Sequence, residues 1–336
     1  ENITGTGTLR REMLVLDDVS LQQISTLKQE NSPVQFALMG SFGTTFLVNS
    51  ATEPTFNFQP GEKVRLSLLN TANTRTFRVS IPTTVLSLVG TDQGESFPGT
   101  PINSIILGPS DRTTVDVTFP ETADIFRLEH SAPNGKVVVL AHFKSTKTKV
   151  LQGKSVMEKP ASLDIPNPEI ITHALSGIPA LTLKLTSSPT MMGDHGMMHG
   201  DIGDDGIEWE DTMPQMNAMM TEKTIKWQII DEKNGQINMK INPLFKRGSF
   251  VKIRIENPVD QPHAMQHPFH LHGQRFIVLS ENTIPNKDIR WEDTILVPAG
   301  KTLDILVEMN NPGTWMMHCH IAEHLSAGMM ATFTVE

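Results

Sequence analysis

The chain repeats itself with an offset of 187 to 189 residues, and this repeat restricts its fold more than any other feature. Gly61 is matched by Gly248, and Pro109 is matched by Pro298. Three pairs of segments follow the same order: GEKVRLSLLN at 61–70 and GSFVKIRIEN at 248–257, INSIILGPSDRTTVDV at 102–117 and WEDTILVPAGKTLDIL at 291–306, and DIFRLEHS at 124–131 and TWMMHCHI at 314–321. A period of this length indicates two copies of one domain within the 336 residues.

Apolar and polar residues alternate in the repeated segments. Val64, Leu66 and Leu68 are separated by Arg65 and Ser67. The same period of two recurs at 115–119, 251–255 and 303–305, and clusters of Gly, Pro and Asn separate these runs at 133–135 and 310–313. Alternation of this kind is typical of half-buried strands, and no long stretch keeps a capped helical period. The sequence therefore predicts an all-β fold made of sandwiches.

The domain organisation follows from the repeat. We expect a first domain at 1–150, a linker rich in Pro, Ser and Asn at 151–180, and a second domain at 181–336. A loop rich in Met, Gly and Asp occupies 190–220. In the first copy, residues such as Arg78, Ser80 and Glu129 occupy positions that carry His and Cys in the second copy. Only the second copy is therefore expected to hold a metal.

Composition excludes several classes of protein. The longest apolar runs, such as 137–141, are far shorter than the roughly 20 residues that span a bilayer, which argues against a membrane protein. The net charge is −9 and there is no basic stripe, which argues against binding to nucleic acid. The single cysteine excludes an intrachain disulfide framework.

The chain begins at Glu1 without a charged and apolar leader, so we expect a processed or cut N-terminus.

Six of the twelve histidines, together with the only cysteine, lie in two short segments. The first segment is HPFHLHG at 267–273, and the second is HCHIAEHLSAGM at 318–329. Because side chains alternate along a strand, His318 and His320 should point to one face while Cys319 points to the other. His270 and His272 should likewise share one face. Pairing of these strands would gather four imidazoles on one side and the sulfur on the other.

The second segment continues past the strand end, where His324 and Met329 can fold back towards Cys319, and His267 can join them from the first segment. Two His, one Cys and a weak axial Met form the ligand set of a blue-copper electron-transfer centre, because thiolate and thioether are soft ligands that select copper. Two other interpretations remain. Cys319 could be a buried small residue, or Cys and His could bind zinc, which would leave at least two of these histidines unused.

At this point the chain resembles the multicopper oxidases, whose third domain carries an HxxHxH motif and an HCHxxxH-x4-M motif. The resemblance covers the whole chain, from LVLDD at 14–18 through FGTTFLVN at 42–49 to the C-terminus. It implies two cupredoxin-like Greek-key β-sandwich domains joined by a linker. It also implies copper as the cofactor and O2 as the final electron acceptor.

The resemblance implies a role for each ligand. It assigns the type 1 copper to His267, Cys319, His324 and Met329, the type 2 copper to His270, and the type 3 coppers to His272, His318 and His320. Glu323 stands where the family carries a carboxylate implicated in proton delivery during O2 reduction. As an alternative, Glu323 could be a solvated surface charge.

One departure from the family pattern affects the expected activity. The family's trinuclear cluster uses eight histidines, four of them from a first domain with two HxH motifs. Here the remaining histidines form no such pair: His130, His142, His173, His195, His199 and His263. The chain is therefore similar to domains two and three with the first domain absent, and we expect it to be inactive in O2 reduction alone. A single-copper electron-transfer or copper-binding protein is the non-catalytic alternative.

The resemblance leaves the substrate open between a phenol or aromatic amine, as for a laccase, and Cu(I), as for a cuprous oxidase. The Met-rich loop and Met265 favour Cu(I), whereas His263 replaces an acidic residue expected there. Trp291 and Trp315 could stack on aromatic substrates, or they could be core residues. The expected partners are the small-molecule substrate, O2 and the missing first domain or its chain. Export to the bacterial periplasm or the outside of the cell is expected from the family.

Overall fold

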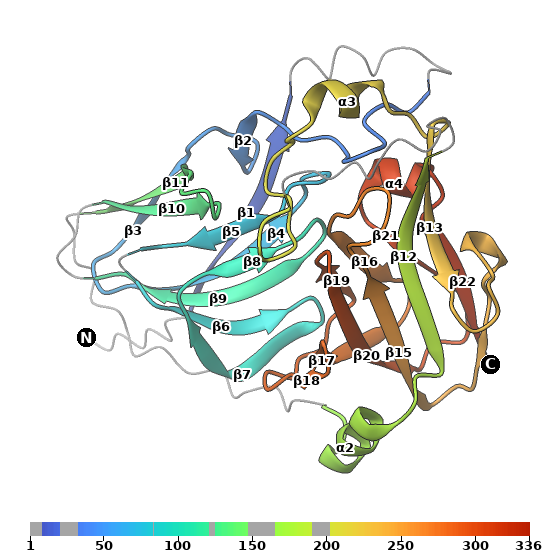
Figure 1. Ribbon diagram of the computed structural model, residues 1–336. Helices are drawn as coiled ribbons and strands as arrows, with labels where there is room; N and C mark the ends of the chain where they lie inside the picture. The colour runs from blue at the N-terminus through green and yellow to red at the C-terminus, as the bar shows by residue number, and fades with distance from the viewer. Residues whose placement is uncertain (1–8, 21–32, 83, 121–124, 147–164, 190–201) are drawn as a thin grey trace. The chain divides into compact units, whose positions relative to one another are not determined.

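The computed structural model describes residues 9–20, 33–82, 84–120, 125–146, 165–189 and 202–336 (Figure 1). The chain divides into two compact units. Unit 1 contains Glu1–Ser20, Gly43–Ala72 and Thr76–Leu163, and unit 2 contains Leu21–Phe42, Asn73–Arg75 and Asp164–Glu336. Nothing in the sequence pattern predicts the two short segments that unit 2 takes from the N-terminal half.

Unit 1 consists of two facing sheets in its described residues. The larger sheet has the order β2 (Thr45–Val48), β1 (Arg10–Val19), β4 (Lys63–Asn70), β9 (Arg112–Thr118), β6 (Leu86–Thr91) and β7 (Gly94–Ile102). The smaller sheet has the order β3 (Thr55–Phe58), β11 (Val137–Ser145), β10 (Ile125–Ser131), β5 (Phe77–Ser80) and β8 (Ile105–Leu107). Alternate residues of both sheets, such as Leu66, Val117, Val79 and Leu128, form one core cluster.

Unit 2 has the same construction in the part of the chain that is described. Its larger sheet has the order β13 (Ile225–Asp231), β12 (Leu181–Pro189), β15 (Ser249–Asn257), β20 (Lys301–Met309), β17 (Arg275–Glu281) and β18 (Ile284–Pro285). Its smaller sheet has the order β14 (Leu244–Phe245), β22 (Met330–Val335), β21 (Gly313–Cys319), β16 (His267–Leu271) and β19 (Thr294–Val297). The strand order matches that of unit 1 position by position, so the internal repeat corresponds to a repeated sandwich and the all-β prediction is confirmed.

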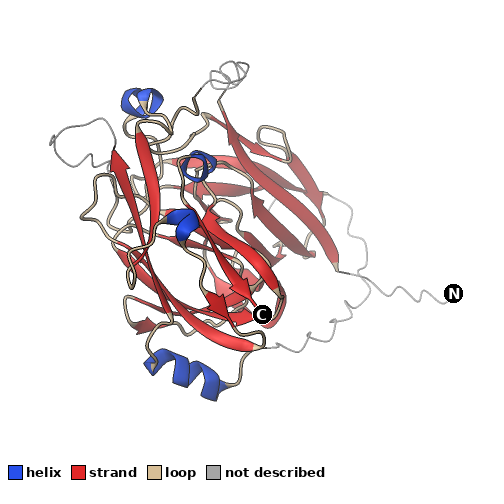
Figure 2. Ribbon diagram, turned by 90° about the vertical axis from the view of Figure 1, so that its right-hand side faces the viewer, coloured by secondary structure: helices blue, strands red, loops and turns tan. Residues whose placement is uncertain are grey.

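Helices are few and short among the described residues (Figure 2). They are α2 (Pro168–Ser176), α3 (Pro214–Met219), the 3-10 turn η1 (Asn238–Lys240) and α4 (Ala322–Ser326). Helix α2 lies within the segment expected as a linker, and the Asn167 side chain caps its N-terminus by accepting from the Glu169 backbone at 2.9 Å. Residues 151–164 of that segment and 190–201 of the Met-rich loop lie outside the described residues. None of the described helices is long and apolar enough to cross a membrane.

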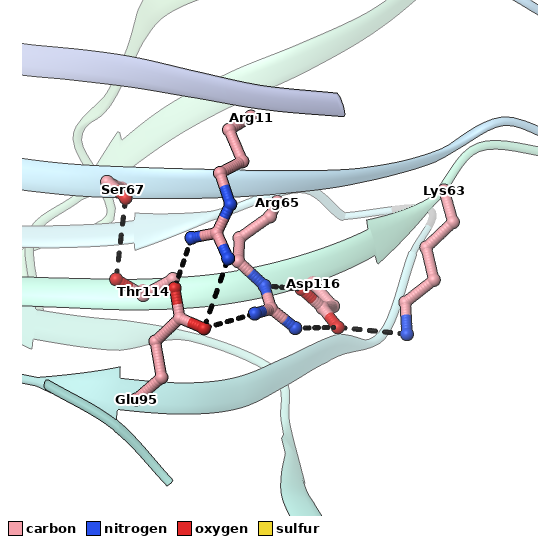
Figure 3. A network of polar contacts seen from close by, with 7 residues as sticks. All are labelled: Arg11, Lys63, Arg65, Ser67, Glu95, Thr114 and Asp116. Atoms are coloured by element: carbon pink, nitrogen blue, oxygen red, sulfur yellow. Dashed lines mark hydrogen bonds and ion pairs between the residues drawn. The ribbon is translucent and has the colours of Figure 1, made fainter. Parts of the chain in front are cut away.

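An Arg–Asp pair joins the two central strands of the larger sheet in unit 1 (Figure 3). Arg65 on β4 lies directly opposite Asp116 on β9. The Arg65 Nε and Nη2 atoms donate to the two carboxylate oxygens at 2.7 and 3.0 Å, and Lys63 Nζ lies 2.9 Å from Asp116 Oδ2. Glu95 accepts hydrogen bonds from both Arg65 and Arg11. The buried Asp116 carboxylate therefore has its charge compensated on both sides.

Unit 2 contains the same ion pair at the equivalent position. Arg254 on β15 lies opposite Asp304 on β20 and donates to its two oxygens at 2.7 and 3.0 Å. Lys252 Nζ lies 3.1 Å from Asp304 Oδ2. The pattern Lys-x-Arg on one strand and Asp on its neighbour is thus common to both units, which shows that it belongs to the sandwich rather than to a metal site in one of them.

The ion pairs shift the pKa values of the two aspartates. Burial alone would raise the pKa of Asp116, but hydrogen bonds from Arg65 and Lys63 and their positive charges outweigh it, so the pKa lies below its ordinary value. The pKa of Asp304 is lowered in the same way. A carboxyl group whose pKa is lower in the folded state than in the unfolded state stabilises the fold above its unfolded pKa.

We predict that Asp116→Asn lowers the free energy of unfolding of unit 1 by about 1–3 kcal/mol at pH 7, because the buried Arg65 loses one of its two carboxylate partners and keeps only its contact with Glu95. The difference from the wild type should shrink in acid, because the stabilisation by Asp116 is lost as the pH falls through its lowered pKa. Urea unfolding between pH 7 and pH 3 measures both effects. Asp260→Asn, the same change at an exposed carboxylate, is the control and should cost little. A difference that stays constant with pH would contradict the prediction.

Candidate metal centre

The strands β16 and β21 bring the two histidine segments side by side. They pair antiparallel, with Phe269 opposite Cys319 and His270 opposite His318. Side chains alternate across a sheet, so His270 and His318 share one face while Phe269 and Cys319 share the other. The arrangement predicted from strand parity is therefore present. The face that carries Cys319 turns into the core of unit 2.

Three donor groups meet on the core face. His267 Nδ1 lies 3.6 Å from Cys319 Sγ, and His324 Nδ1 lies 3.7 Å from it. These three side chains form a group of donors that could hold a metal, since all of the donor atoms lie within 4.8 Å of one another. All three side chains are fully buried.

Local structure explains why His324 and Met329 return to Cys319. After β21 the chain turns at Ile321 into the short helix α4, which carries His324. The Met329 backbone N–H then donates to the His324 carbonyl at 2.9 Å, and its carbonyl accepts from the Cys319 N–H at 3.2 Å. Met329 is fully buried in the same core cluster as Cys319. The main chain of Met329 is thus fixed to two of the three donor residues.

Burial keeps the donors uncharged when no metal is bound. It lowers the pKa of His267 to about 3, with a smaller contribution from the charge of His263. The pKa of His324 lies well below its ordinary value because of burial and then the charges of His267 and His263, with the backbone of Leu38 opposing the shift. Burial raises the pKa of the Cys319 thiol. The two imidazoles therefore keep their lone pairs available across the physiological pH range.

The donor set fits copper. In a near-tetrahedral metal site, a nitrogen ligand lies about 2.0 Å and a sulfur ligand about 2.3 Å from the ion, so these two ligand atoms are about 3.6 Å apart. This separation agrees with the distances from Cys319 Sγ to the two Nδ1 atoms. Two imidazoles with one thiolate in a site that excludes water suit a soft metal ion better than a hard one. The alternative that Cys319 is only a small buried residue does not explain why two buried imidazoles turn Nδ1 towards its sulfur.

Four imidazoles gather on the opposite face. The ring centroids of His270 and His272 are 5.0 Å apart, those of His272 and His318 are 5.1 Å apart, and those of His318 and His320 are 5.8 Å apart. The Nε2 atoms of His272 and His318 lie 3.0 Å from each other. The four side chains are less buried than the core set, and His320 is exposed.

In two of these rings, Nδ1 lies within hydrogen-bond distance of protein oxygen atoms. His270 Nδ1 lies 2.9 Å from the Asp293 carbonyl and 3.0 Å from Thr294 Oγ1. His318 Nδ1 lies 2.8 Å from the Cys319 carbonyl. A ring whose Nδ1–H donates to a carbonyl presents the Nε2 lone pair to a metal. The two rings are therefore oriented to bind through Nε2.

The pKa values of this face also favour neutral rings. The pKa of His318 is lowered to about 4, mainly by burial, and the neighbouring histidine charges add to the shift while the Cys319 backbone opposes it. The pKa of His272 is lowered by burial and then by His270, with Asp293 opposing. Close cationic rings would repel one another, which favours the neutral forms of His272 and His318.

Glu323 is buried and held by two side chains that the sequence analysis does not identify. Ser41 Oγ and Asn73 Nδ2 donate to its two carboxylate oxygens, and Asn73 Oδ1 accepts from the Ala322 backbone at 3.2 Å. Its residue exposure is 8%. The interpretation of Glu323 as a solvated surface charge is therefore wrong. No local pattern could reveal Ser41 and Asn73, because they are separated from Glu323 by 282 and 250 positions.

The other candidate residues have core positions. Trp291 belongs to a small core cluster. The guanidinium carbon of Arg275 lies over the Trp291 ring, 4.1 Å from the ring centroid. Trp315 is partly buried and packs on the core of unit 2. Met265 and His263 are fully buried.

Strand register identifies the counterparts of the metal-site positions in unit 1. Phe77 pairs with Leu107 as His267 pairs with Val297. Ser80 and Glu129 pair as His270 and His318 do, and Val79 and His130 pair as Phe269 and Cys319 do. Unit 1 therefore has Phe77 where unit 2 has His267, and His130 where unit 2 has Cys319. The His130 ring lies edge-on to Phe77, with centroids 5.4 Å apart.

Comparison with known proteins agrees with this geometry. A family model described as multicopper oxidase matches residues 209–336, the part of the chain that contains the donor residues of both faces. The chain is 26% identical over 299 residues to the multicopper oxidase mco of Staphylococcus haemolyticus and 25% identical over 316 residues to the multicopper oxidase MmcO of Mycobacterium tuberculosis. Residues 209–336 therefore match the multicopper oxidase family, and most of the chain is similar to multicopper oxidases.

The coverage of these matches is uneven. They include 88% and 91% of the chain but only 53% and 55% of the two relatives, so the chain spans about half the length of these multicopper oxidases. A laccase of Cryphonectria parasitica is 41% identical over 100 residues, which are 24% of the chain. Among solved structures, a laccase-like multicopper oxidase, CueO, from Ochrobactrum sp. matches 98% of the chain and 67% of its own length, at 23% identity and a TM-score of 0.70. This last likeness shows the fold.

We predict that Gly40→Ala disturbs the support of Glu323. Gly40 has φ +81°, and a Cβ there would lie 2.1 Å from Thr74 Oγ1 and 2.7 Å from Ile321 Cγ2. Overpacking of this kind costs about 1–3 kcal/mol. Gly235→Ala is the matched control, because Gly235 also has positive φ (+70°) but no atom within 4 Å of the added carbon. Urea unfolding of unit 2 should show the larger loss for Gly40→Ala, and equal losses would contradict the prediction.

Proposed function

We propose that the chain is the copper-binding part of a laccase-type multicopper oxidase. In this proposal His267, Cys319, His324 and Met329 hold a type 1 copper, His270 holds a type 2 copper, and His272, His318 and His320 hold type 3 coppers. The observation that carries it is the position of Cys319, which faces two buried imidazoles on one side of its strand while the preceding residue, His318, joins the imidazole cluster on the other side. Copper bound at these sites would supply one-electron oxidation of the substrate on the first face and reduction of O2 to water on the second.

Residues of this chain hold the two ligand sets in place and connect them. The covalent bonds from Cys319 Sγ to the His318 and His320 rings run along one backbone segment, which offers an electron a through-bond route between the two faces. The burial of His267, Cys319 and His324 keeps water from the type 1 ligands. Buried, closely packed ligands change little in position between oxidation states, which favours rapid electron transfer.

Glu323 is the proposed proton carrier for O2 reduction. It follows His320 by three residues, and Ser41 and Asn73 fix both of its oxygens. A carboxyl group held at a defined position near the reacting oxygen can supply protons that the reduction consumes.

The imidazole face needs further ligands. In this chain no HxH motif occurs outside the two segments already assigned, and the match covers only about half of each relative. We propose that a further domain of the same family, in a longer protein or a separate chain, supplies the remaining four histidines. Without that domain this chain should not reduce O2.

Phenols or aromatic amines are the proposed substrates, in keeping with the laccase among the relatives. Cuprous ion is the second candidate, because Met265, Met220 and Met329 lie in the same core cluster as Cys319 and provide thioethers that prefer Cu(I). Export from the cytoplasm stays a prediction.

We predict that the purified chain, loaded with Cu(II) and freed of excess metal, shows an intense blue absorption band and retains about one firmly bound copper per chain. It should consume no O2 with a phenolic reductant. Cys319→Ser should lose the blue band and the bound copper, since the hydroxyl is a poor, hard replacement for the thiolate. Metal analysis, absorption and EPR spectra and an oxygen electrode provide the measurements.

His173→Ala is the control for these measurements, because His173 is exposed on α2 and should leave the blue band unchanged. Retention of the band in Cys319→Ser would overturn the type 1 assignment. Consumption of O2 by the chain alone would overturn the proposal that a further domain is required. A blue chain that stays without oxidase activity after the matching domain is added would favour the single-copper electron-transfer protein.

A further inference from the structure

The largest fully buried side chain in the described residues, that of Trp227, lies against both buried imidazoles of the metal centre. Its indole is stacked on the His324 ring, with centroids 4.1 Å apart and an angle of 28° between the planes. It meets the His267 ring edge-on, at 4.9 Å and 73°. One indole ring from β13 thus contacts two candidate copper ligands, which come from β16 and α4.

The indole N–H and the main chain of Trp227 form hydrogen bonds with three other segments. Trp227 Nε1 donates to the Ala37 carbonyl at 2.7 Å. Its backbone N–H donates to the Ala327 carbonyl at 3.2 Å, and its carbonyl accepts from Asn238 Nδ2 at 3.1 Å. Every polar group of Trp227 is therefore satisfied inside unit 2, and the ring has little freedom to rotate.

The two imidazoles lack the support that metal-binding histidines usually have. A ligating His normally donates its second ring N–H to a carboxylate or carbonyl, which fixes the ring plane. Among the described residues, Nε2 of His267 is buried without a hydrogen-bond partner, and His324 has only an interaction with the Leu38 backbone that falls outside regular hydrogen-bond geometry. The rings of His270 and His318 on the other face do have such partners. Contacts other than regular hydrogen bonds must therefore contribute to the orientation of the core pair.

We propose that Trp227 is a positioning residue for the type 1 copper ligands. Its stacked face sets the plane of the His324 ring, its contact with His267 sets the second ring, and its bulk keeps water from both. This rests on the proposed function for the metal, but the orientation of His324 by Trp227 is a property of the metal-free chain as well. The electron-rich indole face also favours an imidazole that carries positive charge from a bound cation.

The test compares Trp227→Leu, which removes the aromatic ring, with Trp227→Phe, which keeps an aromatic ring but lacks the indole N–H. In the metal-free protein, NMR should find the His324 ring protons shifted upfield by the indole ring current. The shift should largely persist with Phe and disappear with Leu. In the copper-loaded protein, Trp227→Leu should lose copper to a chelator about tenfold faster or more and change the copper hyperfine splitting in the EPR spectrum, whereas Trp227→Phe should stay close to the wild type.

Trp291→Leu is the matched control, because Trp291 lies in a separate core cluster of the same unit. A purely structural role of Trp227 would lower the stability of both Leu variants and leave the hyperfine splitting and the rate of copper loss of folded Trp227→Leu unchanged, and that result would overturn the proposal. Failure of the wild type to bind copper would instead overturn the proposed function. The NMR comparison would then decide the positioning of His324 on its own: an unshifted His324 ring in the wild type would refute it.

Discussion

The antiparallel pairing of β16 with β21 places the donors of both faces at once. With Phe269 opposite Cys319 and His270 opposite His318, one face of the pair carries the sulfur and the other carries imidazoles. A slip of one residue in either strand would exchange the faces of every side chain on that strand. The apolar neighbours Leu271 and Met317, which are buried in the core, oppose such a slip because it would expose them. The same hydrophobic pattern that folds the sandwich therefore sets the positions of the donors.

The two faces differ in how they keep their imidazoles oriented and uncharged. On the core face, complete burial depresses the pKa of His267 and His324 and raises that of Cys319, so binding of a metal requires the loss of a thiol proton. On the opposite face, backbone and hydroxyl oxygens hold His270 and His318 by their Nδ1 atoms. Burial with aromatic contact orients the rings on one face and hydrogen bonding orients them on the other, and in both cases a ring lone pair is directed.

Much of this arrangement could be predicted from the sequence, and the missing part has a common cause. Strand alternation, the repeat and the segments around His270 and Cys319 are local patterns with a fixed period, so they identify the fold and both histidine clusters. Ser41, Asn73 and Trp227 act through contacts across large sequence separations, and no spacing identifies them. The segment that contains Ala37 and Ser41 packs in unit 2 although its sequence neighbours belong to unit 1, which only the tertiary structure reveals.

The counterpart positions in unit 1 separate the requirements of the scaffold from those of the chemistry. Both copies retain the Lys-x-Arg and Asp arrangement on the central strands, but an aromatic ring stands in the place of His267 and an imidazole in the place of Cys319. The same sandwich therefore forms with metal-donor side chains at these positions or with a phenyl ring and an imidazole in contact there. The architecture does not depend on the donor residues, so substitutions at these positions can change metal binding without changing the strand order.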